Sequence, residues 1–149
     1  MSDLDLIKKI REASSLSVGE ISKALKEAGG DEGKALELLR ARGMAIADKK
    51  SSREIKEGVV EAYIHSNKKI GALLELGSET DFVARNAEFQ NLAHDLAMQV
   101  ASMQPQNVKE LLTQSFIKDP AITVSDLVNQ HIAKLGENIR IGKFTRFEL

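Results

Sequence analysis

The sequence predicts an α+β fold in which three short helices precede a small antiparallel sheet packed with helices. In the first 43 residues, apolar side chains recur at helical spacing between signals that start and stop helices. From residue 58 the pattern changes to short runs of β-branched and large apolar residues that a polar turn separates. We therefore predict a three-helix module over residues 1–43, a linker over residues 44–52 and an α+β domain over residues 53–149.

The start of the chain is predicted to form the first two helices of the module. One face of the first helix is apolar and carries Leu6, Ile7 and Ile10. Ser17 and Glu20 have the spacing of a capping box, which would start the second helix. Leu16 and Ile21 flank this box at the spacing of a hydrophobic staple and strengthen the prediction.

The third helix is predicted between two glycine signals. Gly29 and Gly30 supply a left-handed stop for the preceding helix, and Asp31 caps the new one. The inward face of the third helix is expected to carry Ala35, Leu36 and Leu39. Gly43 is expected to end this helix, so that residues 44–52 form a linker, with or without helical structure of its own.

Two apolar runs, at residues 58–65 and 70–76, predict a β-hairpin because the polar turn Ser66–Lys69 lies between them. Asn86 is a suitable N-cap for the long helix that follows, and Pro105 lies just past its end. The buried face of this helix is expected to carry Phe89, Leu92, Leu96, Val100 and Met103.

A final helix and a final strand complete the predicted domain. The helix spans about residues 124–135 and stops at Gly136. Its buried side is expected to carry Leu127, Val128, Ile132 and Leu135. In the remaining residues, Ile139, Ile141, Phe147 and Leu149 alternate as in a third strand.

Composition and charge exclude several classes of function. The 21 basic and 22 acidic side chains leave a formal net charge of −1, whereas nucleic-acid-binding proteins usually carry a positive excess. No apolar run approaches the ~20 residues of a membrane helix, and the charged N-terminus does not resemble a secretion signal. Without cysteine the chain has neither disulfides nor a thiolate metal site. We therefore expect a cytoplasmic protein that contacts no membrane and binds no cofactor.

No catalytic or metal-binding group of residues stands out. His65, His94 and His131 lie in different predicted elements, so we expect no metal site. The serines are not accompanied by a nucleophile elbow, and the glycines near residue 30 lack the Lys-Ser/Thr pair of a phosphate-binding loop. We therefore expect a protein that is not an enzyme.

The segment SETDFVARN, residues 78–86, is too distinctive for a simple connector between a hairpin and a helix. Ser78 and Asp81 have capping-box spacing, which predicts a single helical turn. Phe82 follows within this polar stretch, and two roles remain open for its side chain. The side chain either packs inward as a core anchor, which is the commoner role, or is offered to a partner.

Residues 79–86, ETDFVARN, resemble the central signature of the elongation factor Ts family. Other runs resemble family segments in the family's order. IKKIREAS, KALKEAGGD and KALELLRARG resemble its N-terminal three-helix module, which is related to ubiquitin-associated (UBA) domains. FQNLAHDLAMQVA is similar to the helix after the signature, and IAKLGENIRI with FTRFEL resembles the end of its short members. The resemblance implies that residues 1–43 form a UBA-like module.

This resemblance implies a translation elongation factor that exchanges the guanine nucleotide of the GTPase elongation factor Tu by displacing Mg²⁺ from it. The family's Mg²⁺-displacing segment matches Thr80, Asp81, Phe82 and Val83. Within it, Phe82 would be the wedge that enters the GTPase. Further partner contacts are implied at Arg11, Val18, Arg85 and Asn86. The implied partner is a protein, with no direct contact to nucleic acid.

The chain departs from the family pattern at three places. Gly77-Ser78 stand where members commonly have asparagine-cysteine, and Ser17–Gly19 stand where they have a Gly-Met-Met-like run. Only Pro105–Lys118 separates the long helix from the final helix, where relatives carry a longer insertion used for dimerisation or a second lobe. An unpaired sheet edge in this shorter chain favours a non-covalent homodimer.

Two other functions remain open from the sequence alone. An adaptor could use the N-terminal module to bind an apolar helix, although it has no reason to carry the signature at residues 79–86. A ribosome-associated RNA-binding protein could share the fold, although the near-zero net charge argues against it.

Overall fold

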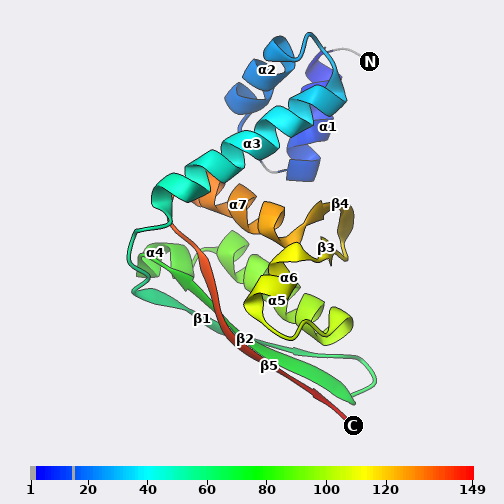
Figure 1. The fold of residues 1–149 in the computed structure, drawn as a ribbon, viewed down its shortest axis with the longest axis vertical. Helices are drawn as coiled ribbons and strands as arrows, with labels where there is room; N and C mark the ends of the chain where they lie inside the picture. Colours follow the sequence, from blue (N-terminus) through cyan, green and yellow to red (C-terminus); the bar gives the residue numbers. More distant parts are fainter. Residues whose placement is uncertain (1–2, 15) are drawn as a thin grey trace. The chain divides into compact units, whose positions relative to one another are not determined.

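The structure is a computed structural model that describes residues 3–14 and 16–149 (Figure 1). In the described part of the chain, three helices come first and a small antiparallel sheet with further helices follows. This order confirms the α+β class predicted from the sequence.

The chain divides into two compact units. The first unit runs to Ser52 and includes Asn129–Gly136, and the second comprises Arg53–Val128 with Glu137–Leu149. The predicted boundaries put residues 129–136 in the α+β domain, whereas here they belong to the first unit. The division of the chain into independent domains stays a prediction.

Three helices make up most of the first unit: α1 (Asp3–Ser14), α2 (Val18–Glu27) and α3 (Glu32–Lys50). Their apolar stripes meet in one core, as helical spacing predicts. The buried residues of this core are Leu6, Ile10, Ile21, Ala24, Leu25, Ala35 and Leu39. Leu16, one half of the predicted staple, packs against the same core.

The start and end of α2 and the start of α3 follow the predicted signals. Ser17 caps α2, because its side chain accepts the Glu20 N–H at 3.2 Å. Gly29 and Gly30 have φ angles of 65° and 85°, a left-handed conformation that glycine adopts without steric cost. Asp31 then caps α3 by accepting the N–H three residues later at 3.1 Å.

The predicted end of the third helix at Gly43 is wrong. Helix α3 continues through this glycine to Lys50, and Gly43 is buried inside the helix. A single glycine costs a helix only about 1 kcal/mol relative to alanine, and good helix formers follow it here. A Cβ added at Gly43 would lie 3.9 Å from Asn129 Cβ of the same unit, an ordinary van der Waals contact, so the packing here does not require glycine. Residues 44–50 are therefore helical.

Two residues assigned to buried helix faces are instead exposed. Leu36 lies outside the stripe of α3 that Ala35, Leu39 and Gly43 form at i, i+4 spacing, so its side chain points to solvent. Met103 is the last residue of the long helix and is also exposed. Periodicity predicted that both helices exist but included one residue beside the buried stripe of α3 and one at the exposed end of α5.

The sheet of the second unit has three antiparallel strands in the order β1-β2-β5. They are β1 (Glu57–Ile64), β2 (Ile70–Ser78) and β5 (Arg140–Glu148). The predicted hairpin is confirmed, and Lys68 takes a left-handed φ of 64° in its turn. Since β1 and β5 each pair with β2 alone, both are edge strands.

Helix α5 (Ala87–Met103) covers one face of this sheet and packs on all three strands (Figure 1). Asn86 caps it as predicted, since its side chain accepts the Glu88 N–H at 2.8 Å. The helix buries Phe89, Leu92, Ala93, Leu96, Ala97 and Val100, and the facing strand residues include Ala72, Leu74 and Leu76. These residues form the core under the site described below.

A β-bulge interrupts the pairing of β2 with β5. Leu76 pairs with Ile141, but Leu74 pairs with Phe144, so two residues of β5 lie opposite Glu75. The Glu75 carboxylate accepts the Lys143 N–H at 2.9 Å and stabilises the bulge. One extra residue in a strand turns every later side chain to the other face.

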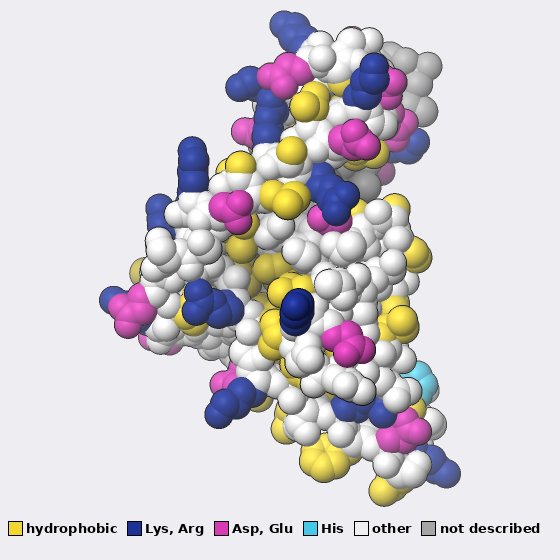
Figure 2. Space-filling view, in the orientation of Figure 1, with side chains coloured by type: hydrophobic (Ala, Val, Ile, Leu, Met, Phe, Trp, Pro, Cys, Tyr) yellow, Lys and Arg dark blue, Asp and Glu magenta, His cyan; other side chains and the backbone are white. Residues whose placement is uncertain are grey.

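The predicted third strand is confirmed, and the bulge explains why its alternation is interrupted. Ile139 and Ile141, before the bulge, are buried. After it, Arg146 faces α5 and donates from Nε to the Ala101 carbonyl at 2.8 Å, whereas Phe147 and Leu149 are 70% and 98% exposed. Figure 2 shows exposed hydrophobic side chains where Figure 1 places the C-terminus. The outer face of the sheet is therefore apolar near its end.

The stretch between the long helix and the last one contains elements that the sequence analysis did not predict. Helix α6 (Val108–Thr113) is followed by a two-stranded ribbon, β3 (Ser115–Phe116) with β4 (Asp119–Thr123). The amide of Gln99, which is fully buried on α5, donates to the Ser115 carbonyl at 3.0 Å and accepts the Ile117 N–H at 3.0 Å. A buried polar side chain thus anchors the ribbon to α5.

Helix α7 (Val124–Leu135) has the predicted bounds, and Gly136 with a φ of 79° ends it. Leu127, Val128 and Ile132 are buried as predicted, and Leu135 is half-buried.

Candidate functional site

The candidate site is a single helical turn, α4 (Asp81–Ala84), between the hairpin and α5. Thr80 caps it, because its hydroxyl oxygen accepts the Val83 N–H at 3.4 Å. The turn was predicted, but the predicted cap at Ser78 is wrong. Ser78 is fully buried at the end of β2 and donates its hydroxyl to the Thr80 carbonyl at 2.9 Å.

The turn separates its residues into exposed and buried ones. Phe82 is 82% exposed, whereas Val83 and Ala84 are only 9% and 3% exposed. The structure therefore contradicts the core-anchor role for Phe82 and leaves its ring open to a partner. Val83, which the resemblance also implicates, is a buried anchor of the turn.

Charged side chains flank the exposed ring. Asp81 and Arg85 form an ion pair of 2.9 Å at i, i+4 spacing, and both are exposed. Such a pair in water contributes little to stability. Its consequence for the site is that an acidic and a basic group lie on either side of Phe82 in the chain. Asn86 follows as the cap of α5, so its side chain already has a structural role.

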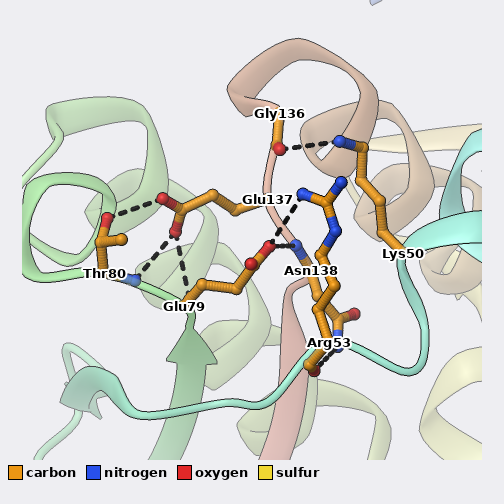
Figure 3. Close-up of polar contacts among 7 residues, drawn as sticks. All are labelled: Lys50, Arg53, Glu79, Thr80, Gly136, Glu137 and Asn138. Atoms are coloured by element: carbon orange, nitrogen blue, oxygen red, sulfur yellow. Dashed lines mark hydrogen bonds and ion pairs between the residues drawn. The ribbon is translucent and has the colours of Figure 1, made fainter.

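Glu137, which follows α7 and its glycine stop, binds the start of this turn (Figure 3). One carboxylate oxygen accepts the Glu79 N–H at 3.1 Å and the Thr80 N–H at 3.0 Å. The other accepts the Thr80 hydroxyl at 2.6 Å. Hydrogen bonds to an ionised carboxylate are stronger than those between neutral groups. Glu137 therefore fixes both the backbone and the side chain of the residue that caps α4.

Glu79 returns the contact from the other side. Its carboxylate accepts the Asn138 N–H at 2.6 Å and lies 3.7 Å from the Arg53 guanidinium. The Asn138 amide in turn donates to the Arg53 carbonyl at 2.9 Å. In this reciprocal arrangement each glutamate binds the backbone beside the other, and residues 79–80 are joined to residues 137–138 (Figure 3).

A separate contact in Figure 3 belongs to the first unit. Lys50, at the end of α3, donates from Nζ to the Gly136 carbonyl at 2.8 Å. This bond joins the end of α3 to the residue that follows α7. It also places a cation at the C-terminus of α7, where a positive charge is favourable.

Arg11 and Val18 lie in the first unit and not with the turn. Both are exposed. Arg11 lines a groove of about 410 Å³ whose walls include Leu16, Leu39 and Ala133. The structure therefore brings Thr80 to Asn86 together but places the other two implied contacts in a different unit.

Metal and membrane sites do not emerge in the described residues. They contain no group of three or more His, Cys, Asp or Glu side chains placed to hold a metal ion. Tyr63 has His65 as its hydrogen-bonding partner at 3.1 Å and meets the edge of His94 at 5.8 Å between ring centroids. No helix in the same part of the chain has the length and apolar character to cross a membrane.

Comparison with known proteins identifies the family. The model of the family described as Elongation factor TS matches residues 79–149, which include α4 and Glu137. Elongation factor Ts of Thermotoga petrophila is 41% identical, in an alignment that covers 98% of this chain and 95% of the relative. Elongation factor Ts of a Synechococcus strain is also 41% identical, over 99% of this chain and 68% of the relative. That of Thermodesulfovibrio yellowstonii is 38% identical, over 97% and 94%.

The Thermotoga petrophila alignment spans 189 positions, more than the 149 residues of this chain, so the relative has residues that this chain lacks. Their location at residues 105–118 stays a prediction. The alignments extend over nearly the whole chain, and the family model covers the turn that carries Phe82. The chain belongs to the Elongation factor Ts family of translation elongation factors.

Proposed function

We propose that this protein is the guanine-nucleotide exchange factor of elongation factor Tu and that it promotes GDP release by displacing Mg²⁺. It breaks and forms no covalent bond. Instead, it favours a conformation of the GTPase that holds nucleotide and metal weakly. Because such coupling is reciprocal, GTP binding in turn releases the exchange factor. A coupling of ~3 kcal/mol, at the top of the usual range, corresponds to more than a hundredfold loss of affinity.

The exposure of Phe82 is the single observation that carries this proposal. An aromatic ring in water at the tip of a short turn gains about 2–3 kcal/mol when a partner buries it. The buried neighbours Val83 and Ala84 hold the backbone of the turn, so little backbone freedom is lost when a partner binds the ring. Phe82 is thus suited to act as a wedge between elements of the GTPase.

The other implied residues divide into contacts and supports. Asp81 and Arg85 are exposed beside Phe82, and in the proposal they pair with charges on the GTPase. Thr80 and Val83 instead hold the turn in place, because one caps it and the other is buried. Arg11 and Val18 would provide a second contact from the UBA-like module, and Asn86 would keep its role as the cap of α5.

We also propose a non-covalent homodimer. The outer face of the sheet exposes Val60, Ile64, Leu73, Phe147 and Leu149. Several of these residues line a shallow groove of about 340 Å³ on that face. Exposed apolar patches of this kind commonly mark interaction surfaces, and the unpaired edge strands β1 and β5 border this one.

Release of fluorescent GDP from elongation factor Tu tests the main proposal. With the full chain present, release is expected to accelerate in proportion to its concentration until the GTPase is saturated. Added Mg²⁺ is expected to oppose the acceleration if displacement of the metal is the mechanism. An unchanged release rate at saturating protein would contradict the proposal and favour the adaptor alternative.

A further inference from the structure

We propose that Glu137 is a positioning residue of the exchange site: it holds the cap of α4 and thereby fixes the direction in which Phe82 is presented. This inference rests on the proposed function. Glu137 lies 55 residues beyond Phe82 in the chain, and both of its carboxylate oxygens are bound to residues 79 and 80, so in this proposal it acts through Thr80.

The first step is the way in which the carboxylate is occupied. Both of its oxygens are used: one accepts the N–H groups of Glu79 and Thr80, and the other accepts the Thr80 hydroxyl at 2.6 Å. Three donors from two adjacent residues converge on one side chain. Such a carboxylate acts as a clamp on the backbone that leads into α4.

The second step concerns the Thr80 hydroxyl. It donates its only proton to Glu137 and therefore presents its lone pairs to the Val83 N–H, 3.4 Å away. A hydroxyl that rotates freely caps a helix less well than one held in the accepting orientation. Glu137 thus acts on α4 through the hydroxyl as well as through the backbone.

The third step is the size of the turn. Helix α4 has four residues, and one isolated helical turn is unstable because nucleation is unfavourable. The buried side chains of Val83 and Ala84 hold its end, and the clamp at Thr80 holds its start. Phe82 lies between these two anchors. Loss of either anchor allows the ring to sample directions that do not fit a partner.

Glu137 itself is held in place, as a positioning residue must be. The next residue, Asn138, is buried and donates its N–H to Glu79 at 2.6 Å and its side-chain amide to Arg53 at 2.9 Å. The bond to Arg53 anchors the clamp outside the segment that it holds, and the bond to Glu79 adds a second link to that segment. The clamp affects binding through the fraction of molecules whose turn has the binding conformation. The apparent affinity for the partner is the intrinsic affinity multiplied by this fraction.

The test compares Glu137→Ala and Glu137→Gln with the parent by two measurements. Amide hydrogen exchange of the protein alone reports the turn, and release of fluorescent GDP from elongation factor Tu reports the site. Asn107→Ala is the matched control, because it removes the side-chain cap of α6, the other short helix of this unit. Thr80→Val, combined with Glu137→Ala, tests whether the two residues act together.

In Glu137→Ala we expect the amides of Glu79, Thr80 and Val83 to exchange about tenfold faster, while amides of the sheet keep their protection. Acceleration of GDP release is expected to fall about tenfold. Glu137→Gln retains an oxygen for both backbone N–H groups, so it should keep their protection, lose that of Val83 and exchange nucleotide at an intermediate rate. If the two residues act together, the double variant Thr80→Val/Glu137→Ala should accelerate GDP release nearly as much as Thr80→Val alone.

Unchanged amide exchange at Thr80 and Val83 in Glu137→Ala would overturn the inference. So would accelerated amide exchange with GDP release equal to that of Asn107→Ala. Glu137→Ala could also unfold, which would appear as loss of amide protection across the sheet. In that case the Val83 amide of Glu137→Gln is the test, and unchanged protection of this amide would overturn the inference. A parent protein that fails to accelerate GDP release contradicts the proposed function instead, and the amide measurement still decides whether Glu137 holds the turn.

Discussion

In the turn at residues 81–84, the exposed Phe82 and the two buried residues beside it have different roles. Val83 and Ala84 supply the burial that keeps the turn folded, and Phe82 contributes almost nothing to the core. Stability and partner binding therefore depend on different side chains of the same turn. They can be separated by single substitutions.

Phe82→Ala is expected to change the free energy of unfolding by less than ~0.5 kcal/mol, because the ring is exposed. The acceleration of GDP release is expected to fall at least about tenfold, since removing a buried aromatic contact at an interface typically costs 2 kcal/mol or more. Thermal unfolding and GDP release measured on the same preparation check both expectations.

Two further variants make the comparison specific. Met103→Ala truncates another exposed apolar side chain of the same unit and should leave both measurements unchanged. Val83→Ala removes buried methyl groups and should lower stability by about 1–2 kcal/mol. A Phe82→Ala protein that folds normally and releases GDP at the parent rate would exclude the wedge.

At this scale the sequence pointed to Thr80–Val83 through family resemblance, but not to the burial of each residue. A four-residue turn is too short for periodicity to separate Phe82 from Val83. The contribution of Glu137 was not predictable, because its partner Thr80 lies 57 residues away and hydrogen bonds across such a separation leave no local spacing. The run containing Glu137 resembled the family, but nothing in the run indicated what the carboxylate binds.

Among the elements, the ribbon of β3 and β4 depends on one buried amide. Gln99 satisfies the Ser115 carbonyl and the Ile117 N–H, and it also donates to the Gln114 side chain at 3.2 Å. No apolar side chain can replace these bonds. The ribbon is thus attached to α5 by polar contacts as well as by the burial of Phe116.

Gln99→Leu keeps the approximate volume of the side chain and removes its hydrogen bonds. Ser115 is exposed, so water can replace part of the loss at its carbonyl, whereas Ile117 is partly buried; we therefore expect a destabilisation of about 1–3 kcal/mol. Amide exchange should accelerate at residues 115–123 more than in the sheet. Equal stability of Gln99→Leu and the parent in thermal unfolding would show that the ribbon does not need this anchor.

The elements that could be predicted are those with strong local signals. Ser17, Asp31 and Asn86 each cap a helix as predicted, and the hairpin follows its polar turn. Gly43 was wrongly taken as a stop because a glycine within a helix and one after it look alike in sequence. The ribbon at residues 115–123 was missed because its strands are short and its attachment to Gln99 is tertiary.

At the scale of the whole molecule, the first unit includes residues 129–136. Lys50 binds the Gly136 carbonyl, and Gly43 packs beside Asn129. A fragment that starts at Arg53 therefore keeps its sheet but loses the partners of this segment. We expect it to fold, to show fast amide exchange at residues 129–136, and to bind elongation factor Tu more weakly than the full chain. Equal affinity of fragment and full chain would assign the UBA-like module another role.

Self-association through the outer face of the sheet is the second prediction at this scale. Phe147→Asp places a charge in the middle of the exposed apolar residues, and burial of an unpaired charge in an interface is strongly unfavourable. Sedimentation equilibrium at micromolar concentration should therefore show a dimer for the parent and a monomer for the variant. The parent's mass must not change under reducing conditions, since the chain has no cysteine. A monomeric parent at high micromolar concentration excludes the dimer.

The bulge opposite Glu75 determines whether odd-numbered or even-numbered residues at the end of the chain face the core. In FTRFEL, Phe144 lies on one face of the strand, and Phe147 and Leu149 lie on the other. The number of residues between Ile141 and Phe144 decides which of these faces packs on the core. With one residue fewer, Phe147 would turn toward α5 and Arg146 toward solvent, without any change in composition. A deletion at Gly142 or Lys143 would thus exchange interior and exterior over residues 144–148 of β5, while a substitution at either position would not.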